Sequence, residues 1–69
     1  MENNMAVRLN GEPAQLQKGT TIAGLVAPMV QSAGVAIALN GEVIARSLWP
    51  ETQLSTGDQI EIIQAVQGG

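Results

Sequence analysis

The alternation of large apolar and polar side chains predicts a strand near each end of the chain. In residues 5–9 every second residue is large and apolar, which is the period of a strand with one buried face. Residues 59–66 begin with the same period, because Ile60 and Ile62 alternate with Glu61. These are the longest and most apolar strands, so we expect them to pair in parallel at the centre of one sheet.

Two Asn-Gly pairs predict tight hairpin turns. The tetrapeptide Leu-Asn-Gly-Glu occurs twice, and its Asn-Gly pairs are Asn10-Gly11 and Asn40-Gly41. Both residue types tolerate the positive φ that a type I′ turn requires. The first turn leads into residues 13–17, a short strand that we expect at an edge of the sheet because Pro13 has no N–H to donate.

Apolar residues at helical spacing predict one amphipathic helix. They form a continuous stripe at i, i+3, i+4, i+7 and i+8, made of Ile22, Leu25, Val26, Met29 and Val30. Thr20 or Thr21 offers a side-chain oxygen to cap this helix, which we expect to run for about ten residues. Pro28 cannot donate to the carbonyl of Gly24, so we expect a kink or a frayed last turn there.

The second half of the chain repeats the hairpin pattern. Val35–Leu39 is an apolar run of strand length, and its Asn-Gly turn leads into a short strand over residues 42–45. Residues 46–53 have no regular pattern, and we expect Leu54 to close the sheet from below. A helix between two hairpin-like units predicts an α+β fold, a mixed sheet of four to five strands with one main helix packed on one face.

The same pattern divides the chain into three parts. We expect a flexible N-terminal extension over residues 1–4, a folded domain over 5–66 and a flexible Gly-Gly tail over 67–69. If the last strand is central, the chain after Val66 leaves the sheet, and it can extend roughly 13 Å beyond the body.

Composition removes most catalytic chemistry from consideration. Cys and His are both absent, which excludes a thiol nucleophile, imidazole base catalysis, disulfides and the usual zinc ligands. The six acidic residues are scattered singly and lack the spacing of a calcium or magnesium loop. We therefore expect no catalytic residues and no metal site.

Charge and hydropathy limit the partners. The net charge is −3, and the three cations do not form the cluster that nucleic-acid phosphates require. No apolar run approaches the roughly 20 residues of a membrane span, and the first residues lack the pattern of a signal peptide. We therefore expect a cytoplasmic protein, monomeric when alone, that binds neither nucleic acid nor membranes.

The Gly-Gly end is the one feature that asks for a chemical explanation. Glycine lacks a Cβ, so Gln67-Gly68-Gly69 can thread into a channel too narrow for larger residues. The group that such a tail delivers is the α-carboxylate of Gly69, an anion at neutral pH. A carboxylate becomes reactive once it is activated at a nucleotide phosphate.

Several motifs follow one another in a fixed order along nearly the whole chain. They are Val-Arg-Leu-Asn-Gly (7–11), Gly-Thr-Thr-Ile (19–22), Ala-Leu-Asn-Gly-Glu-Val-Ile (38–44) with Arg46 and Trp49, Gly-Asp-Gln-Ile-Glu-Ile (57–62) and Ala-Val-Gln-Gly-Gly (65–69). Together these motifs resemble those of the ThiS family, ubiquitin-like β-grasp sulfur carriers of thiamine biosynthesis. Residues 1–4 and Pro28 depart from the pattern of the family.

The resemblance implies a mechanism centred on Gly69. An E1-like activating enzyme would use ATP to adenylate the Gly69 carboxylate. A sulfur donor, such as a cysteine desulfurase or a sulfurtransferase, would then convert it to a thiocarboxylate that donates sulfur to thiazole synthase. The chain would bind no cofactor itself and would carry its sulfur covalently. Exposed Ile63 and Ala65, together with Arg46 and Trp49, are candidates for docking these partners, although Trp49 also suits a core anchor.

Three other interpretations share parts of this pattern. The small subunit of molybdopterin synthase has the same fold and thiocarboxylate, but its family carries a Pro-Pro-Val segment before Gly-Gly, which residues 64–67 lack. A ubiquitin-type modifier would share the activation step but would form isopeptide bonds. A plain β-grasp interaction module would need no chemistry at Gly69.

Overall fold

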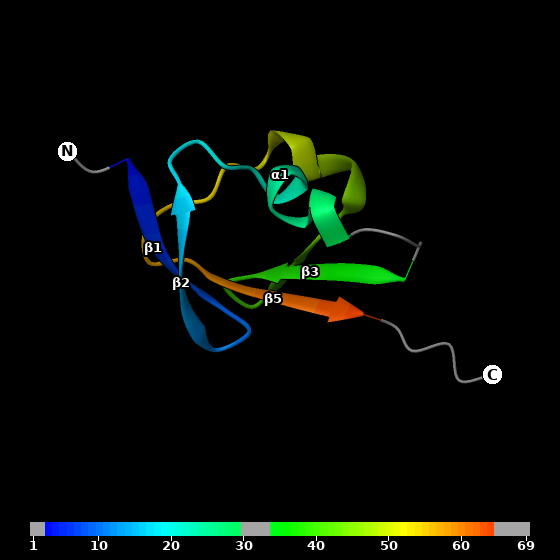
Figure 1. The fold of residues 1–69 in the computed structure, drawn as a ribbon. Helices are drawn as coiled ribbons and strands as arrows, with labels where there is room; N and C mark the ends of the chain where they lie inside the picture. The colour runs from blue at the N-terminus through cyan, green and yellow to red at the C-terminus, as the bar shows by residue number, and fades with distance from the viewer. Residues whose placement is uncertain (1–2, 30–33, 65–69) are drawn as a thin grey trace.

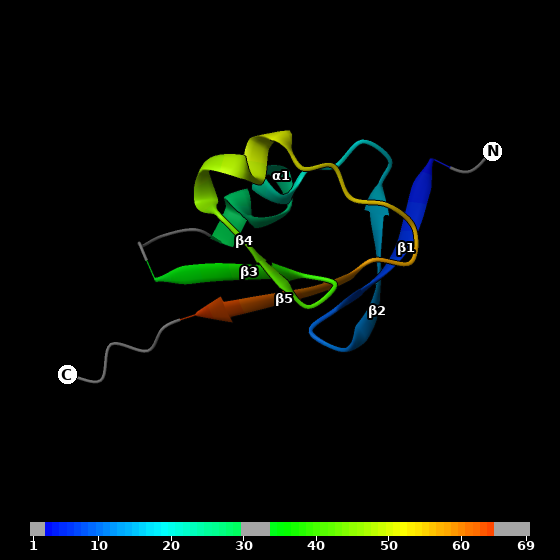
Figure 2. The same cartoon turned by 180° about the vertical axis from the view of Figure 1, so that it is seen from behind.

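The computed structural model describes residues 3–29 and 34–64 and shows a five-stranded sheet with helical segments on one face (Figures 1 and 2). The spatial order of the strands is β2-β1-β5-β3-β4. Their bounds are β1 Asn4–Leu9, β2 Glu12–Gln17, β3 Val35–Leu39, β4 Glu42–Ile44 and β5 Gln59–Gln64. The helical segments are α1 Ile22–Val26 and the 3-10 helices η1 Ala27–Met29 and η2 Arg46–Glu51. The α+β fold expected from the sequence is confirmed.

Strand β5 occupies the centre of the sheet, as its apolar pattern predicts. It pairs in parallel with β1 over only Arg8↔Gln59 and Leu9↔Ile60. On its other side it pairs antiparallel with β3 along its whole described length, from Leu39↔Ile60 to Val35↔Gln64. The first half of β5 therefore has two neighbouring strands, whereas its second half has one.

Both predicted Asn-Gly turns are present. Asn10 and Asn40 each have a φ of 53°, and the glycines that follow them have φ values of 83° and 87°. Positive φ at both central residues is the signature of the type I′ turn. The paired register Leu9↔Glu12 shows that β2 begins one residue earlier than predicted.

Asn3 and Asn4, which were expected in a flexible extension over residues 1–4, contact the end of the β1–β2 hairpin. Asn4 is already part of β1 and pairs with Gln17. The carbonyl of Asn3 accepts a hydrogen bond from the N–H of Lys18 (2.9 Å). Residues 3 and 4 are therefore held beside the end of β2 by backbone contacts.

The α-helix is shorter than the predicted length of about ten residues. It is capped by Thr21, whose Oγ1 accepts from the N–H of Gly24 (3.1 Å), and it ends at Val26. Pro28 lies in the 3-10 turn η1 that follows. Since Pro28 cannot supply the N–H of an α-helical bond to Gly24, the chain tightens into a 3-10 turn at this point. Of the predicted apolar stripe, Val30 lies outside the described residues.

Residues 46–53 are more regular than their sequence pattern suggests. Most of them form η2, which contains Pro50. The indole N–H of Trp49 donates to the carbonyl of Ile44 (3.0 Å) and ties η2 to the end of β4. A bond from the N–H of Ile22 to the carbonyl of Thr52 (3.0 Å) links η2 to α1. A short 3-10 segment has too few residues to show a helical period.

The core lies between the sheet and the helical segments. Alternate residues of β1, β3 and β5 face it, together with side chains from α1, η2 and the loop that precedes β5. The buried cluster comprises Met5, Val7, Ile22, Val26, Val35, Ile37, Trp49, Leu54 and Ile60. Leu54 is buried as the sequence predicts, and the opposite face of the sheet is left without a covering layer among the described residues.

Replacing a core residue of β3 tests this assignment of faces. Ile37→Ala deletes a fully buried side chain and should reduce the free energy of unfolding by about 2–5 kcal/mol, measured by urea denaturation. Val43→Ala, on the neighbouring strand β4, shortens a side chain that is 68% exposed and should change it by less than about 0.5 kcal/mol. Equal losses in the two variants would contradict the assignment.

Candidate functional site

The described part of the candidate site is the strand from which the Gly-Gly tail continues. Strand β5 ends at Gln64, beside Val35 at the start of β3. The predicted modified residue Gly69 and the threading residues Gln67 and Gly68 lie outside the described residues, as does the docking candidate Ala65. The structure therefore shows how β5, the strand that precedes the tail, is held in the sheet.

Asn10 extends the support of β5 beyond the end of β1. Its backbone N–H donates to the carbonyl of Ile60 (2.8 Å), which continues the parallel ladder by one step. Its side-chain Oδ1 then accepts from the N–H of Ile62 (2.8 Å). The side-chain carbonyl of Asn10 thus takes the place of a backbone carbonyl that β1 no longer supplies.

Asn40 does the same from the other side of β5. Its backbone N–H donates to the carbonyl of Gln59 (2.7 Å), and its Oδ1 accepts from the N–H of Gln59 (2.9 Å). Its Nδ2 also donates to Oδ1 of Asp58 (3.1 Å), whose Oδ2 accepts from the N–H of Ser55 (2.7 Å). Asn40 therefore links the hairpin turn to the turn that precedes β5.

The two Asn-Gly turns consequently hold the first half of β5 between them. Each Asn contributes one backbone N–H and one side-chain oxygen to the central strand. The sequence reveals their turn conformation but not this second role. The signal that could have revealed it is the repeated Leu-Asn-Gly-Glu, because turn geometry alone does not require Asn rather than Gly at these positions.

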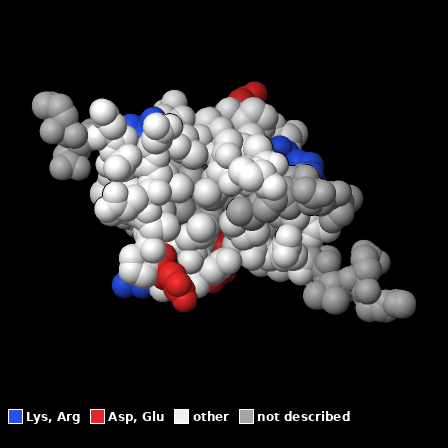
Figure 3. Space-filling model, viewed as in Figure 1, with Lys and Arg blue, Asp and Glu red and all other residues white. Residues whose placement is uncertain are grey.

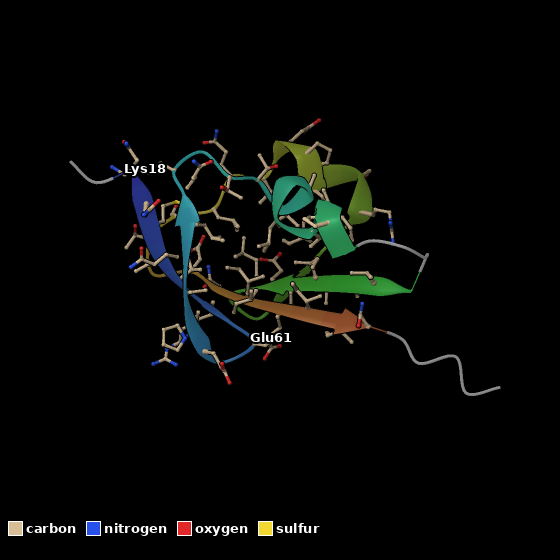
Figure 4. All side chains as sticks on the ribbon, viewed as in Figure 1. Lys18 and Glu61 are labelled. Carbon is tan, nitrogen blue, oxygen red and sulfur yellow. The ribbon has the colours of Figure 1, made fainter. Side chains whose placement is uncertain are left out.

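The uncovered face of the sheet carries an apolar patch, which we define as Ala36, Ala38, Val43 and Ile63. The cross-strand pairs Ala36↔Ile63 and Ala38↔Val43 make it continuous over β5, β3 and β4. Ile63 is 50% exposed, and Val43 also projects into solvent. Glu61, which pairs with Ala38, points away from the helical segments in Figure 4 and marks the same face.

The other two docking candidates lie on a different part of the molecule. Trp49 is 5% exposed and belongs to the core, which favours its interpretation as a core anchor. The guanidinium carbon of Arg46 lies 4.7 Å from the centre of the Trp49 ring, a cation–π contact, and its Nη2 donates to the carbonyl of Val35 (3.4 Å). Arg46 therefore contacts the strand residue that pairs with Gln64, whereas Trp49 lies in the core and Ile63 lies on the uncovered face of the sheet.

The described residues form no pocket and hold no group of three or more acidic residues that would bind a metal ion. In the face shown in Figure 3 the cations stand apart from one another. Within residues 3–29 and 34–64 no helix is long and apolar enough to cross a membrane.

Comparison with known proteins identifies relatives over nearly the whole chain. A sequence model of the ThiS family matches residues 7–69. The sulfur carrier protein ThiS of Thermus thermophilus is 39% identical over 64 residues, which cover 91% of this chain and 98% of that protein. A thiazole synthase of Magnetococcus marinus is 35% identical over 66 residues, which cover 94% of this chain but 20% of that protein. The crystal structure of the thiamine biosynthesis protein ThiS from Geobacter metallireducens superimposes with a TM-score of 0.80 at 28% identity, covering 94% of this chain and all of that one.

The side-chain role of Asn10 can be separated from its turn conformation. Asn10→Gly keeps the positive φ but removes the acceptor of the Ile62 N–H, and it should cost about 1–2 kcal/mol of unfolding free energy. Asn10→Asp keeps an acceptor oxygen at the same position and should cost less than about 0.5 kcal/mol.

Amide hydrogen exchange gives the local readout of the same pair of variants. The Ile62 amide should exchange faster in Asn10→Gly than in Asn10→Asp under native conditions, because only the glycine variant leaves it without an acceptor. Equal protection of Ile62 in the two variants would show that the side chain of Asn10 does not support β5.

Proposed function

The chain belongs to the ThiS family, and from that membership we infer that it is a sulfur carrier of thiamine biosynthesis. The observation that carries this inference is the family match over residues 7–69, which includes the Gly-Gly end. The named relatives of similar length distinguish this assignment from the molybdopterin synthase subunit.

We propose that Gly69 is activated by transfer of an adenylyl group. A carboxylate oxygen of Gly69 attacks the α-phosphorus of ATP in the E1-like activating enzyme, an acyl–phosphate bond forms, and pyrophosphate leaves. This step converts an unreactive anion into an acyl group with AMP as its leaving group. The described residues form no pocket that would hold a nucleotide, and in this proposal the chain is the substrate and the enzyme supplies the catalysis.

Sulfur then replaces AMP on the same carbon. The terminal sulfur of a persulfide, carried by a cysteine desulfurase or a sulfurtransferase, attacks the acyl carbon and displaces AMP. A thiol next cleaves the sulfur–sulfur bond of the acyl disulfide, which leaves the donor as a disulfide and Gly69 as a thiocarboxylate. Such chemistry needs a compartment that keeps thiols reduced, which is consistent with the cytoplasm.

The thiocarboxylate is proposed to donate its sulfur to thiazole synthase. The relative in Magnetococcus marinus supports this partner, because a protein named thiazole synthase contains a segment similar to this chain. Tethering the sulfur to a folded carrier raises its effective concentration at the synthase above that of free sulfide. Glycine at 68 and 69 leaves the end narrow enough to enter an enclosed site.

Docking is proposed to use the apolar patch on the uncovered face, in which Ile63 is the large exposed residue of β5. An apolar surface that is exposed at Ile63 and Val43 and lies beside the end of β5 suits a transient protein interface. Ala65 comes directly after β5 in the sequence. Arg46, which contacts Val35 at the start of β3, would add a charged contact to the partner. Trp49 contributes by holding Arg46 rather than by contact of its own.

Activation of Gly69 is tested by ATP–pyrophosphate exchange with the activating enzyme. The wild-type chain should support exchange. Gly69→Ala should reduce the exchange rate by at least about ten-fold, because a Cβ on the terminal residue would not fit a site narrow enough to require glycine. Gly24→Ala is the matched control, since a Cβ there meets only ordinary contacts at 3.6 and 3.9 Å. Exchange by Gly69→Ala at the wild-type rate would contradict the proposed fit.

The docking patch is tested by placing a charge within it. Ile63→Asp should weaken binding to the activating enzyme by about ten-fold or more, measured by isothermal titration calorimetry. Leu48→Asp is the control, because Leu48 is exposed to a similar extent (48%) but lies on η2, away from the patch. Equal effects of the two substitutions would remove the patch from the interface.

A further inference from the structure

The second half of β5 exposes an open backbone edge. The N–H of Ile62 points to the β1 side, where its acceptor is the side chain of Asn10. In a strand the N–H and C=O of one residue point to the same side, and every second residue repeats this direction. The C=O of Ile62 and both the N–H and C=O of Gln64 therefore point to the side where the β1 ladder has already ended.

Both views of the fold show this edge. In Figures 1 and 2 strand β5 runs past the β1–β2 hairpin, and no other described strand or helix lies along that side of it. The opposite side of the same segment is occupied by β3 through Ala36↔Ile63 and Val35↔Gln64. The open edge is thus confined to residues 62–64, immediately before the tail.

The two outer edges of the sheet are protected, in contrast to this one. On β2, Pro13 stands opposite Arg8 and offers no N–H to a neighbouring chain. On the other side, β4 is only three residues long. Proline and short length are the usual means by which proteins prevent unwanted strand pairing. Neither device protects residues 62–64, so this edge is available for pairing.

We propose that the edge of β5 at residues 62–64 pairs with an extended segment of the activating enzyme and so adds a strand to the sheet. This inference rests on the proposed function. The chain from residue 65 to Gly69 spans at most about 17 Å when extended, so an enzyme that acts on Gly69 also lies against the body near Gln64. Strand addition supplies main-chain hydrogen bonds and a fixed direction to a chain that must enter a narrow site.

The neighbouring side chains define the chemistry of the added strand. On the uncovered face it lies beside Ile63, which favours an apolar residue, and near Glu61, which favours a cationic one. The net charge of −3 on this chain likewise favours a cationic segment in the partner.

The experiment removes the Gln64 amide and leaves the internal ladder intact. Gln64→Pro deletes an N–H that points away from β3 and should weaken binding to the activating enzyme by at least about ten-fold, since ten-fold corresponds to ~1.4 kcal/mol. Gln15→Pro is the matched control. Gln15 pairs with Ala6 on edge strand β2, where its N–H likewise points outward, and this variant should change the affinity by less than about two-fold.

Amide exchange in the wild-type chain gives a second readout that needs no variant. The Gln64 amide should exchange more slowly in the complex with the activating enzyme than in the free chain, by at least about ten-fold. This readout decides the question even if Gln64→Pro is unstable. An unchanged Gln64 amide would overturn the proposal.

The affinities of the two proline variants also separate the strand pairing from the proposed function and from other occupants of the edge. Equal affinity of Gln64→Pro and Gln15→Pro would overturn the pairing, while wild-type adenylation in the same assay would leave the proposed function intact. Absence of adenylation in the wild-type chain would instead overturn the proposed function. Sedimentation of the free chain as a dimer that Gln64→Pro abolishes, with enzyme affinity unchanged, would assign the edge to a second copy of the chain. Loss of affinity for thiazole synthase alone would assign it to the later partner.

Discussion

The position of β5 is the constraint on which the rest of the structure depends. This strand begins between β1 and β3, where backbone hydrogen bonds and the side chains of Asn10 and Asn40 hold it. It then continues past the end of β1 with β3 as its one neighbouring strand among the described residues. Its inward residue Ile60 is fully buried, so the register of the strand is fixed by the core as well. A strand held this firmly at its start gives a defined point of departure to the residues that follow it.

Polar side chains of the described residues support the backbone of the fold. Thr21 caps α1, Asn10 and Asn40 bind the central strand, and Asp58 binds the turn that precedes it. A sulfur carrier without cysteine needs another atom to bear the sulfur, and the proposed mechanism assigns this to the acyl carbon of Gly69. The β-grasp fold alone would not identify that role, because a fold can host many functions. Membership of the ThiS family supplies the function, and the geometry of β5 explains how the body contributes to it.

Local chemistry made most of the fold predictable from sequence. The Asn-Gly turns, the edge position of Pro13 and the central place of β5 each follow from residue type and period. The predicted length of α1 was wrong because the apolar stripe continues past Pro28, whereas Pro28 lacks the N–H that an α-helix would need there. The irregular assignment of residues 46–53 was wrong because a short 3-10 helix leaves no period to detect.

The site was less predictable, since its key contacts are distant in sequence. The bond from Ile62 to Asn10 joins residues 52 positions apart, and no local pattern contains it. The position of Arg46 and Trp49 relative to Ile63 was likewise beyond sequence reasoning, because it depends on how η2 packs against the sheet.

Tandem mass spectrometry of the intact protein tests the central claim most directly. The chain would be incubated with its activating enzyme, ATP and a persulfide donor, and then fragmented along the backbone. The account predicts a mass gain equal to the exchange of one oxygen for sulfur, carried by the fragment that contains Gly69. Sulfur located on any other residue, or no gain under conditions in which ATP is consumed, would contradict it.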